Sequence, residues 1–302
     1  MKILEENGFT GCLEETACPT CDNPQPPNLF FLKKNNIGIW QCPNCEILYA
    51  SPRFTEKSLS EIYESKQFLN RQTLEELENW SYSQWKTSRC RSYITTSLVV
   101  SLVQEYVRNG SRLLDVGSAM GYFVYESRKQ GYATEGIEPS NMLVNIANRK
   151  LNITLHNCRI NDFSDTERFS GIVLWDVLEH VYDPSEMLQH CARLAKPGAY
   201  LFVQVPNYCG ISDRFKTFLH RIHLKNNNFK HFGFPWHVYS FNRKSLGIML
   251  AKSGFQPLKF ESWSHWVKEG KQFILPQIQM MLTKYCLSDY IICVARYSDV
   301  VK

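Results

Sequence analysis

Short apolar runs and amphipathic stretches alternate through residues 112–205, and this alternation restricts the chain to a small set of folds. The runs that resemble strands occupy 112–116, 133–137, 153–156, 171–175 and 199–205. The stretches that resemble helices lie between them, around 121–130, 141–150 and 184–195. Alternation of this kind is typical of a parallel sheet with helices on both faces. The sequence therefore predicts an α/β fold for this part of the chain.

A different pattern governs the first 45 residues, where four cysteines follow the spacing C-x2-C-x20-C-x2-C, namely Cys18, Cys21, Cys42 and Cys45. Tetrahedral zinc needs four thiolates at about 2.3 Å, and each C-x2-C turn supplies two of them. We expect a zinc ribbon, with the strands of its hairpin near 30–32 and 37–40. Because four cysteines leave no open position for water, the zinc is expected to be structural. A segment this short also needs the metal to fold.

Composition narrows the class of protein. The chain has 302 residues, of which 44% are hydrophobic and 21% charged, so it is expected to form a globular core. No apolar run approaches the roughly 18 residues of a membrane span, and the start, MKILEENGFTG, does not resemble a signal peptide. We therefore expect a cytoplasmic protein, in which the 11 cysteines are not disulfides. The net charge of +5 is too small to predict a nucleic-acid partner by itself.

The first predicted strand of the α/β part leads directly into a glycine-containing turn. The run LLDVGSAMG spans 113–121, with Gly117 in the turn and Gly121 at the start of the next helix. Glycine permits a positive φ and lets a ligand approach the backbone closely. Glu138, at the end of the second strand, is placed to bind the two hydroxyls of a ribose. Together these features predict a nucleoside-containing cofactor at the carboxyl edge of the sheet.

Two types of cofactor use such a loop. A dinucleotide fingerprint requires glycine at i, i+2 and i+5. Counted from Gly117, the second and third of these positions hold Ala119 and Tyr122, so two of the three glycines are missing. Asp115, just before the loop, fits S-adenosylmethionine better, because the ammonium group of its methionine half favours a nearby carboxylate. The loop, with Asp115 before it and Glu138 after it, therefore favours S-adenosylmethionine.

A longer stretch carries a family resemblance. Residues 171–184 read GIVLWDVLEHVYDP and are followed by LAKPGA at 194–199 and VPN at 205–207. These segments closely resemble class I S-adenosylmethionine-dependent methyltransferases, in particular the ubiquinone-biosynthesis-like group. The run FPWHVYSF at 234–241 looks like that group's substrate-side histidine segment. The likeness covers most of residues 18–295 and is specific at the level of the family.

The resemblance implies a fold and an order of domains. The fold is α/β, with a Rossmann-like seven-stranded methyltransferase sheet whose last strand, 290–295, is antiparallel, and with a small amino-terminal zinc ribbon. The implied domains are the zinc ribbon at 1–54, a helical linker or cap at 55–109, and an S-adenosylmethionine-binding methyltransferase domain at 110–302. A substrate lid is expected at 206–237.

The resemblance also implies roles for single residues in cofactor binding. Asp115, Gly117 and Gly121 would hold the methionine half. Asp162 resembles the acidic position beside the adenine, although Asn161 stands where the family often has a second acid. The other residues expected around the cofactor are Ser118, Tyr122, Phe123, Glu138 for the ribose, Pro139, Trp175 and Asp176. One departure from the pattern is Ala119, which replaces the middle glycine of the loop and would crowd the cofactor slightly.

Two histidines are candidates for catalysis. His180 follows Glu179 at the start of a helix-like segment, and it either braces the loop or acts as a general base. The same two interpretations apply to His237, which lies in an aromatic stretch after a loop. A base is needed if the methyl acceptor is a hydroxyl or a carbon acid, because its proton must leave. We prefer His237, since its segment differs most between substrates in this fold.

Most of the net charge lies in the segment 206–237, where Asp213 opposes five basic residues, Arg214, Lys216, Arg221, Lys225 and Lys230. The local charge is +4, and the segment adds four histidines and five phenylalanines. One interpretation is a solvated amphipathic helix. The other is a cover over an anionic substrate, such as a nucleotide-linked sugar or a phosphopantetheine-bound acyl group. A weak contact with a membrane surface, reaching a lipid-linked substrate, is also compatible.

The sequence as a whole predicts an S-adenosylmethionine-dependent methyltransferase that acts on a small metabolite by in-line transfer to oxygen or carbon. One alternative is an RNA or protein methyltransferase that uses the zinc ribbon for recognition. Methylases of base amino groups carry Asp or Asn, then Pro-Pro and an aromatic residue, after the fourth strand, whereas this chain has DVLE at 176–179. A nucleic-acid partner is therefore not expected. Another alternative is a non-enzymatic binding protein, against which the intact set of cofactor residues argues.

Overall fold

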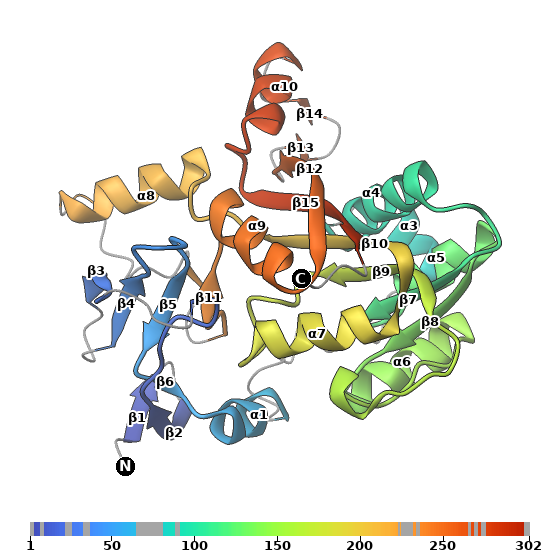
Figure 1. The fold of residues 1–302 in the computed structure, drawn as a ribbon, viewed down its shortest axis with the longest axis horizontal. Coiled ribbons are helices and arrows are strands. Elements are labelled where there is room, and N and C mark those ends of the chain that lie inside the picture. Colours follow the sequence, from blue (N-terminus) through green and yellow to red (C-terminus); the bar gives the residue numbers. More distant parts are fainter. Residues whose placement is uncertain are drawn as a thin grey trace.

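Four buried apolar segments form the parallel strands of a central sheet in the computed structural model (Figure 1). The sheet has the order β12-β15-β10-β9-β7-β8. Its strands are β7 (Arg112–Val116), β8 (Ala133–Ile137), β9 (Phe169–Trp175), β10 (Ala195–Pro206), β12 (Phe255–Trp263) and β15 (Tyr290–Tyr297). The last strand, β15, runs antiparallel to both β10 and β12, as the sequence predicts.

The structure describes most of the chain. The residues that it describes are 3–6, 9–21, 26–32, 37–64, 81–87, 91–222, 224, 232–233, 236–264, 267–268, 271–272 and 276–298. Part of the predicted lid, including Lys225 and Lys230, lies outside these residues. Among the described helices, none combines the length and the apolar character that are needed to span a membrane.

The expected seventh strand, 153–156, is reduced to a single parallel bridge between Ile137 and His156. Two backbone hydrogen bonds hold this bridge. The amide of Glu138 donates to the carbonyl of His156 (3.0 Å), and the amide of His156 donates to the carbonyl of Gly136 (2.8 Å). Ile153 and Leu155 are nevertheless buried beneath helix α6 (Asn141–Leu151), so the segment keeps its place at the edge of the sheet.

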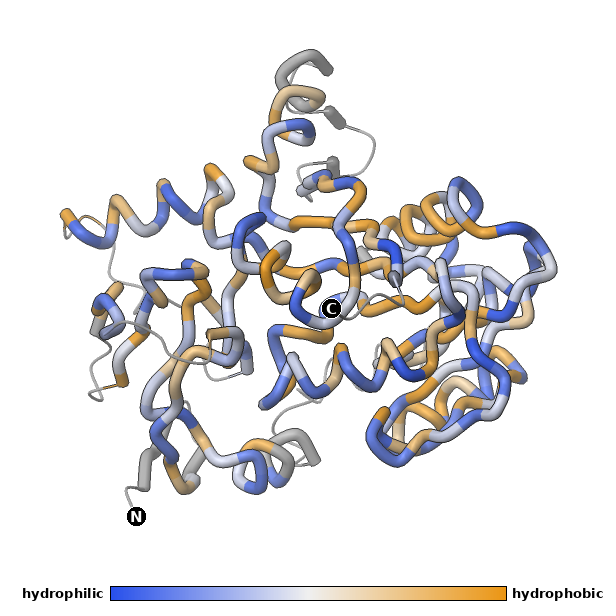
Figure 2. The backbone as a smooth tube through the Cα atoms, viewed as in Figure 1, coloured by the Kyte–Doolittle hydropathy of each residue, from blue (hydrophilic) through white to orange (hydrophobic). Residues whose placement is uncertain are grey.

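Helices cover both faces of the sheet because alternate residues of each central strand point to opposite sides. Val173 of β9 packs with residues of α4 on one face, and Ile172 and Leu174 pack with residues of α7 and α9 on the other. The helices are α4 (Arg91–Tyr106), α5 (Tyr122–Lys129), α6 (Asn141–Leu151), α7 (Pro184–Leu194) and α9 (Arg243–Lys252). Figure 2 shows the central strands as largely hydrophobic, whereas α7 and α8 (Ile211–Arg221) alternate in hydropathy.

The amino-terminal part contains two small antiparallel sheets. One joins β1 (Ile3–Glu6), β2 (Phe9–Glu14) and β6 (Arg53–Phe54). The other has the order β11-β5-β4-β3 and contains the predicted ribbon hairpin. Its strands are β3 (Asn28–Leu32), β4 (Gly38–Gln41), β5 (Leu48–Ser51) and β11 (Tyr239–Ser240). The fourth strand thus comes from a segment nearly 200 residues later in the chain, which the sequence did not predict.

The ribbon is consequently packed against the α/β part rather than standing apart from it. The hydroxyl of Ser185 donates a hydrogen bond to the carbonyl of Pro19 (2.8 Å), and the ammonium of Lys252 donates one to the carbonyl of Thr20 (2.7 Å). One hydrophobic cluster runs from the ribbon strands into α7 and α9. Figure 1 shows this β-rich part beside the carboxyl ends of the parallel strands.

Four further helices and one hairpin complete the described fold. Helices α1 (Glu56–Glu64) and α3 (Tyr82–Thr87) precede α4, and α8 (Ile211–Arg221) follows β10. Helix α10 (Pro276–Lys284) follows a two-stranded hairpin, β13 (Val267–Lys268) and β14 (Lys271–Gln272).

Candidate functional site

The loop after β7 is held tightly against its surroundings. The amides of Gly117 and Ser118 both donate to the carbonyl of Ile137, at 2.9 and 3.0 Å, which ties the loop to the end of β8. Gly117 has φ 76°, and a Cβ there would lie 2.8 Å from the Val177 side chain. Gly121 has φ 71°, and its Cβ would lie 2.4 Å from Ile153. Both positions therefore favour glycine, because each has a positive φ and because Val177 and Ile153 fill the space that a Cβ would need.

Two buried carboxylates flank this loop. Asp115 and Glu138 are only 5% and 6% exposed. Glu138 accepts hydrogen bonds from the amides of Ala119 (2.9 Å) and Ser140 (2.8 Å), and Ala119 has the left-handed φ of 48°. Burial raises the pKa of Asp115 to about 7, and the neighbouring charge of Glu138 adds to the rise. Burial likewise raises the pKa of Glu138. Such buried acids are favoured when a cationic or hydroxyl-bearing ligand completes the site.

The end of β9 carries two further predicted residues. Asp176 has φ 57°, a left-handed conformation that costs a non-glycine residue about 1–2 kcal/mol and is often found at functional sites. Its carboxylate accepts from Gln204 (2.9 Å), which in turn accepts from the indole of Trp263. The indole N–H of Trp175 is buried and has no hydrogen-bond partner among the described residues. A buried donor of this kind is satisfied when a bound ligand supplies an acceptor.

The remaining predicted cofactor residues have different surroundings. Tyr122 stacks on Trp85 of α3, with ring centroids 4.0 Å apart and planes at 6°. Phe123 is buried in the core cluster formed with α4. Pro139 accepts a hydrogen bond from Asn157 through its carbonyl (3.0 Å), and Asp162 is exposed in the short 3-10 helix Ile160–Asp162. The structure therefore gathers Asp115, the loop and Glu138, whereas Phe123 serves the core.

The two candidate histidines lie together, although 57 residues separate them in the sequence. Their ring centroids are 4.8 Å apart and the rings meet edge to face at 83°. Nδ1 of His180 lies 3.1 Å from the carbonyl of Trp236. Since a carbonyl only accepts, Nδ1 carries the hydrogen and Nε2 is the ring nitrogen that can accept a proton. Nε2 lies 3.9 Å from the carboxylate of Glu179, which is 1% exposed.

Glu179, His180 and His237 form a cluster, because their ligand atoms all lie within 4.8 Å of one another. Such a group can share a proton, and it could also hold a cation. Glu179 was not among the predicted site residues, although a carboxylate beside a histidine, just after a strand, is a signal that the sequence contains. The turn that carries Glu179 contacts the cofactor loop, since Val177 packs against Gly117.

Backbone contacts fix the position of His237. The amide of Val238 donates to the carbonyl of Glu179 (2.9 Å), and the amide of His237 donates to the carbonyl of Gly233 (3.1 Å). Gly233 has φ 72°, and a Cβ there would lie 2.3 Å from Nδ1 of His237. The next residues, β11, pair with ribbon strand β5, so that Tyr239 faces Tyr49. The ribbon thus supports one side of the histidine pair.

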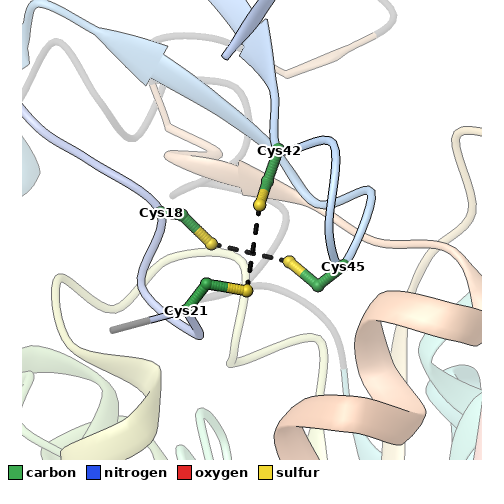
Figure 3. Close-up of side chains that lie close together, drawn as sticks. All are labelled: Cys18, Cys21, Cys42 and Cys45. Carbon is green, nitrogen blue, oxygen red and sulfur yellow. Dashed lines mark hydrogen bonds between the residues drawn. The ribbon is translucent and has the colours of Figure 1, made fainter. Parts of the chain in front are cut away.

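The four predicted zinc ligands converge on one point (Figure 3). The sulfur atoms of Cys18 and Cys45 are 3.5 Å apart, and those of Cys42 and Cys21 are 3.8 Å apart. In a tetrahedral site with zinc–sulfur bonds of about 2.3 Å, neighbouring sulfurs are about 3.8 Å apart. The donor set and its spacing therefore fit a structural zinc ion. Cys12, which lies outside the motif, is not part of this cluster.

A profile of the family described as Methyltransferase domain matches residues 69–259. Among curated proteins, the chain is 32% identical over 126 residues to a ubiquinone biosynthesis O-methyltransferase of Coxiella burnetii. The aligned region covers 39% of this chain and 51% of the relative. The chain is 29% identical over 129 residues to the enzyme of that name from Rhodopseudomonas palustris, covering 40% and 48%. The chain thus spans about half the length of the curated relatives it matches.

Solved structures agree on the fold. A 1,6-didemethyltoxoflavin-N1-methyltransferase of Burkholderia thailandensis, bound to S-adenosylhomocysteine, gives a TM-score of 0.52 at 11% identity and covers 91% of this chain and 100% of its own. Magnesium protoporphyrin IX methyltransferase of Synechocystis, also bound to S-adenosylhomocysteine, gives 0.52 at 18% identity and covers 80% and 99%. With the family match, the sheet order and the cofactor loop, these results identify the chain as a member of the methyltransferase domain family, the class I S-adenosylmethionine-dependent methyltransferases.

Proposed function

We propose that this protein transfers a methyl group from S-adenosylmethionine to an oxygen or carbon atom of a small anionic or carrier-linked metabolite. The observation that carries the proposal is the contact between two parts of the site. The loop with Gly117 packs against Val177, in the turn that presents Glu179 and His180. A cofactor-binding loop and a cluster of proton-transfer groups are thereby neighbours at the carboxyl edge of the sheet.

The residues around the loop fit the cofactor. The carboxylate of Asp115 would pair with the ammonium group of the methionine half, and Glu138 would accept hydrogen bonds from the ribose hydroxyls. The indole N–H of Trp175 would donate to the bound molecule, which satisfies a buried donor that finds no partner in the described part of the chain. When bound, S-adenosylmethionine supplies an electrophilic methyl group on a sulfonium.

In this proposal the histidine pair removes the proton of the acceptor. His237 acts as the general base, and His180 and the buried carboxylate of Glu179 stabilise the positive charge that it acquires. The hydrogen bond from Nδ1 of His180 to Trp236 fixes the tautomer of that ring. Gly233 leaves the space in which the ring of His237 is seated.

Separate observations support a small acceptor, a hydroxyl group on it and an anionic substrate. The ribbon shares a sheet with β11 and is hydrogen-bonded to α7 and α9, and this fixed attachment favours a small acceptor over recognition of RNA or protein by the ribbon. The curated relatives are named for O-methylation in ubiquinone biosynthesis, which supports a hydroxyl as the acceptor. The positive charge of residues 206–237 supports an anionic substrate.

The experiment is release of S-adenosylhomocysteine from S-adenosylmethionine with a panel of acceptors: phenols, nucleotide sugars and carrier-bound acyl groups. We expect turnover with at least one phosphorylated or carrier-linked acceptor, and less with the matched acceptor that lacks the anionic part. Turnover that is equal for charged and uncharged acceptors would contradict the anionic class. No turnover with the whole panel, combined with methylation of RNA or protein, would contradict the small-molecule proposal.

The raised pKa of Asp115 predicts a pH dependence of cofactor affinity. In the ligand-free protein, this carboxyl binds a proton as the pH falls through about 7, and its protonated form cannot pair with an ammonium group. Affinity for S-adenosylhomocysteine should therefore fall by about tenfold from pH 8 to pH 6. Calorimetry over this range measures it. Asp115→Asn should bind more weakly and lose this dependence, whereas a wild-type affinity that is flat between pH 8 and 6 would contradict the role of Asp115.

A further inference from the structure

An open cavity of about 520 Å³ lies beyond the carboxyl end of β10, between α8, the start of α9 and the chain after α10. Its size falls in the range of sites for small molecules. Both polar and apolar groups line it, and no aspartate or glutamate is among them. The residues around it are Asn207, Cys209, Arg214, Asn242, Arg243, Lys244, Gly247, Ile248, Phe260, Tyr285, Cys286 and Leu287.

Two arginines give this cavity an uncompensated positive charge. Arg214 comes from α8 and Arg243 from the first turn of α9, and neither has a carboxylate partner among the described residues. The guanidinium of Arg243 lies over the ring of Phe260, 5.2 Å from its centroid, which restricts its position. The third cation, Lys244, is bonded to the carboxylate of Glu46 at 2.7 Å.

Hydrogen bonds of Asn242 fix the start of α9 where it borders the cavity. Asn242 caps the helix by accepting from the amide of Ser245 (2.8 Å). Its side-chain amide donates to Glu46 of the ribbon (3.0 Å) and to the hydroxyl of Tyr208 (2.9 Å). The first turn of α9 contains no acidic residue, so the positive end of the helix adds to the charge of the two arginines.

We propose that this cavity binds a phosphoryl group carried by the acceptor substrate. Guanidinium groups match the oxygens of a phosphate with paired hydrogen bonds, and here two of them approach from separate elements. The volume exceeds that of one phosphate, and the wall formed by Ile248, Phe260 and Leu287 suits the less polar body of the same molecule. This inference rests on the proposed function and names its anion as a phosphate ester.

The position of the cavity supports this assignment. Asn242 and Arg243 follow His237 on one short segment, which β11 joins to the ribbon. Asn207 follows β10 directly and forms a parallel bridge with Phe241. A phosphate anchored here would hold the acceptor beside the carboxyl edge of the sheet, where parallel sheets bind their ligands.

The test is calorimetric titration of the zinc-loaded full chain with inorganic pyrophosphate. Arg214→Gln and Arg243→Gln should each weaken binding by at least about tenfold, since each removes a charge-assisted contact. The matched control is Arg193→Gln, which removes the same charge from the exposed surface of α7. Affinity for S-adenosylhomocysteine should stay within about twofold in all three variants, which shows that they are folded. Equal pyrophosphate affinity in the four proteins would overturn the site.

Further arms distinguish the possible sources of the phosphate. Uridine diphosphate represents a nucleotide-linked substrate, and 4′-phosphopantetheine represents a carrier. We expect one of them to bind more tightly than pyrophosphate and to lose that affinity in Arg243→Gln. If neither binds more tightly, the apolar wall does not contact the ligand and the assignment fails. If the wild type binds pyrophosphate but does not bind S-adenosylhomocysteine, the proposed function is overturned while the anion site stays in place.

Discussion

Replacing His237 by alanine is expected to lower kcat by about 10²- to 10⁴-fold, which is the usual contribution of a general base. The affinity for S-adenosylhomocysteine should change by less than about twofold, because Asp115, the glycine loop and Glu138 remain intact. The ring centroids of His237 and His180 are 4.8 Å apart, and the ring of His237 lies against Gly233. Steady-state kinetics with the best acceptor of the panel, together with calorimetry, measure the two effects separately.

Two variants make this test specific. Gly233→Ala leaves both histidines in the sequence but places a Cβ 2.3 Å from Nδ1 of His237, so it should lower kcat as well, by a smaller factor. His156→Ala removes an exposed histidine whose side chain is bonded to Glu135 and packed on Phe163, and it should leave kcat unchanged. Wild-type kcat in His237→Ala would refute the role of His237, whereas an equal loss in His156→Ala would point to a nonspecific effect.

Loss of the zinc ligands is expected to have the largest effect on stability. Cys42→Ser should lower the zinc content from one ion per chain to nearly none and reduce the free energy of unfolding by about 3 kcal/mol or more. The reason is that a zinc site contributes its binding energy to folding, and here the ribbon core is continuous with that of α7 and α9. Metal analysis and denaturant unfolding provide the measurements.

The same change should reach the proposed catalytic site. Strand β5, which begins three residues after Cys45, pairs with β11, and the carboxylate of Glu46 accepts hydrogen bonds from the side chains of Asn242 and Lys244. Cys42→Ser should therefore also lower turnover. Cys12→Ser is the matched control, since Cys12 lies outside the cluster, and it should retain full zinc. Full zinc content in Cys42→Ser would contradict the four-cysteine assignment.

The central sheet could be predicted closely because its signals are local. The runs 112–116 and 133–137 match β7 and β8 residue for residue, since a buried parallel strand is a continuous apolar run between a helix and a turn. The segment 153–156 looks similar in sequence, yet only His156 makes a bridge. Tertiary pairing decides how far a short apolar run extends as a strand, and the sequence does not contain that information.

The cofactor loop could be predicted for the same local reason, and His180 and His237 could be named as candidates, but their proximity to each other and to Glu179 could not be predicted. Gly117, Gly121 and their flanking carboxylates lie within about 25 residues of one another. By contrast, Glu179 and His237 lie close together although 58 positions separate them, and the strand that follows His237, β11, pairs with a ribbon strand nearly 200 positions earlier. Trp85, which stacks on Tyr122, lies 37 residues before it in the sequence. Long-range contacts of this kind leave no periodic signal in the chain.

The most direct test of the cofactor site is calorimetric titration of S-adenosylhomocysteine into the zinc-loaded protein at pH 8. We expect one site per chain, with binding weakened at least about tenfold by Asp115→Asn, which removes the charge that pairs with the ammonium group. Asp165→Asn, which changes a partly buried carboxylate paired with Arg112, serves as the control and should bind normally. Absence of binding in the wild type, or equal affinity in Asp115→Asn, would rule out this cofactor site.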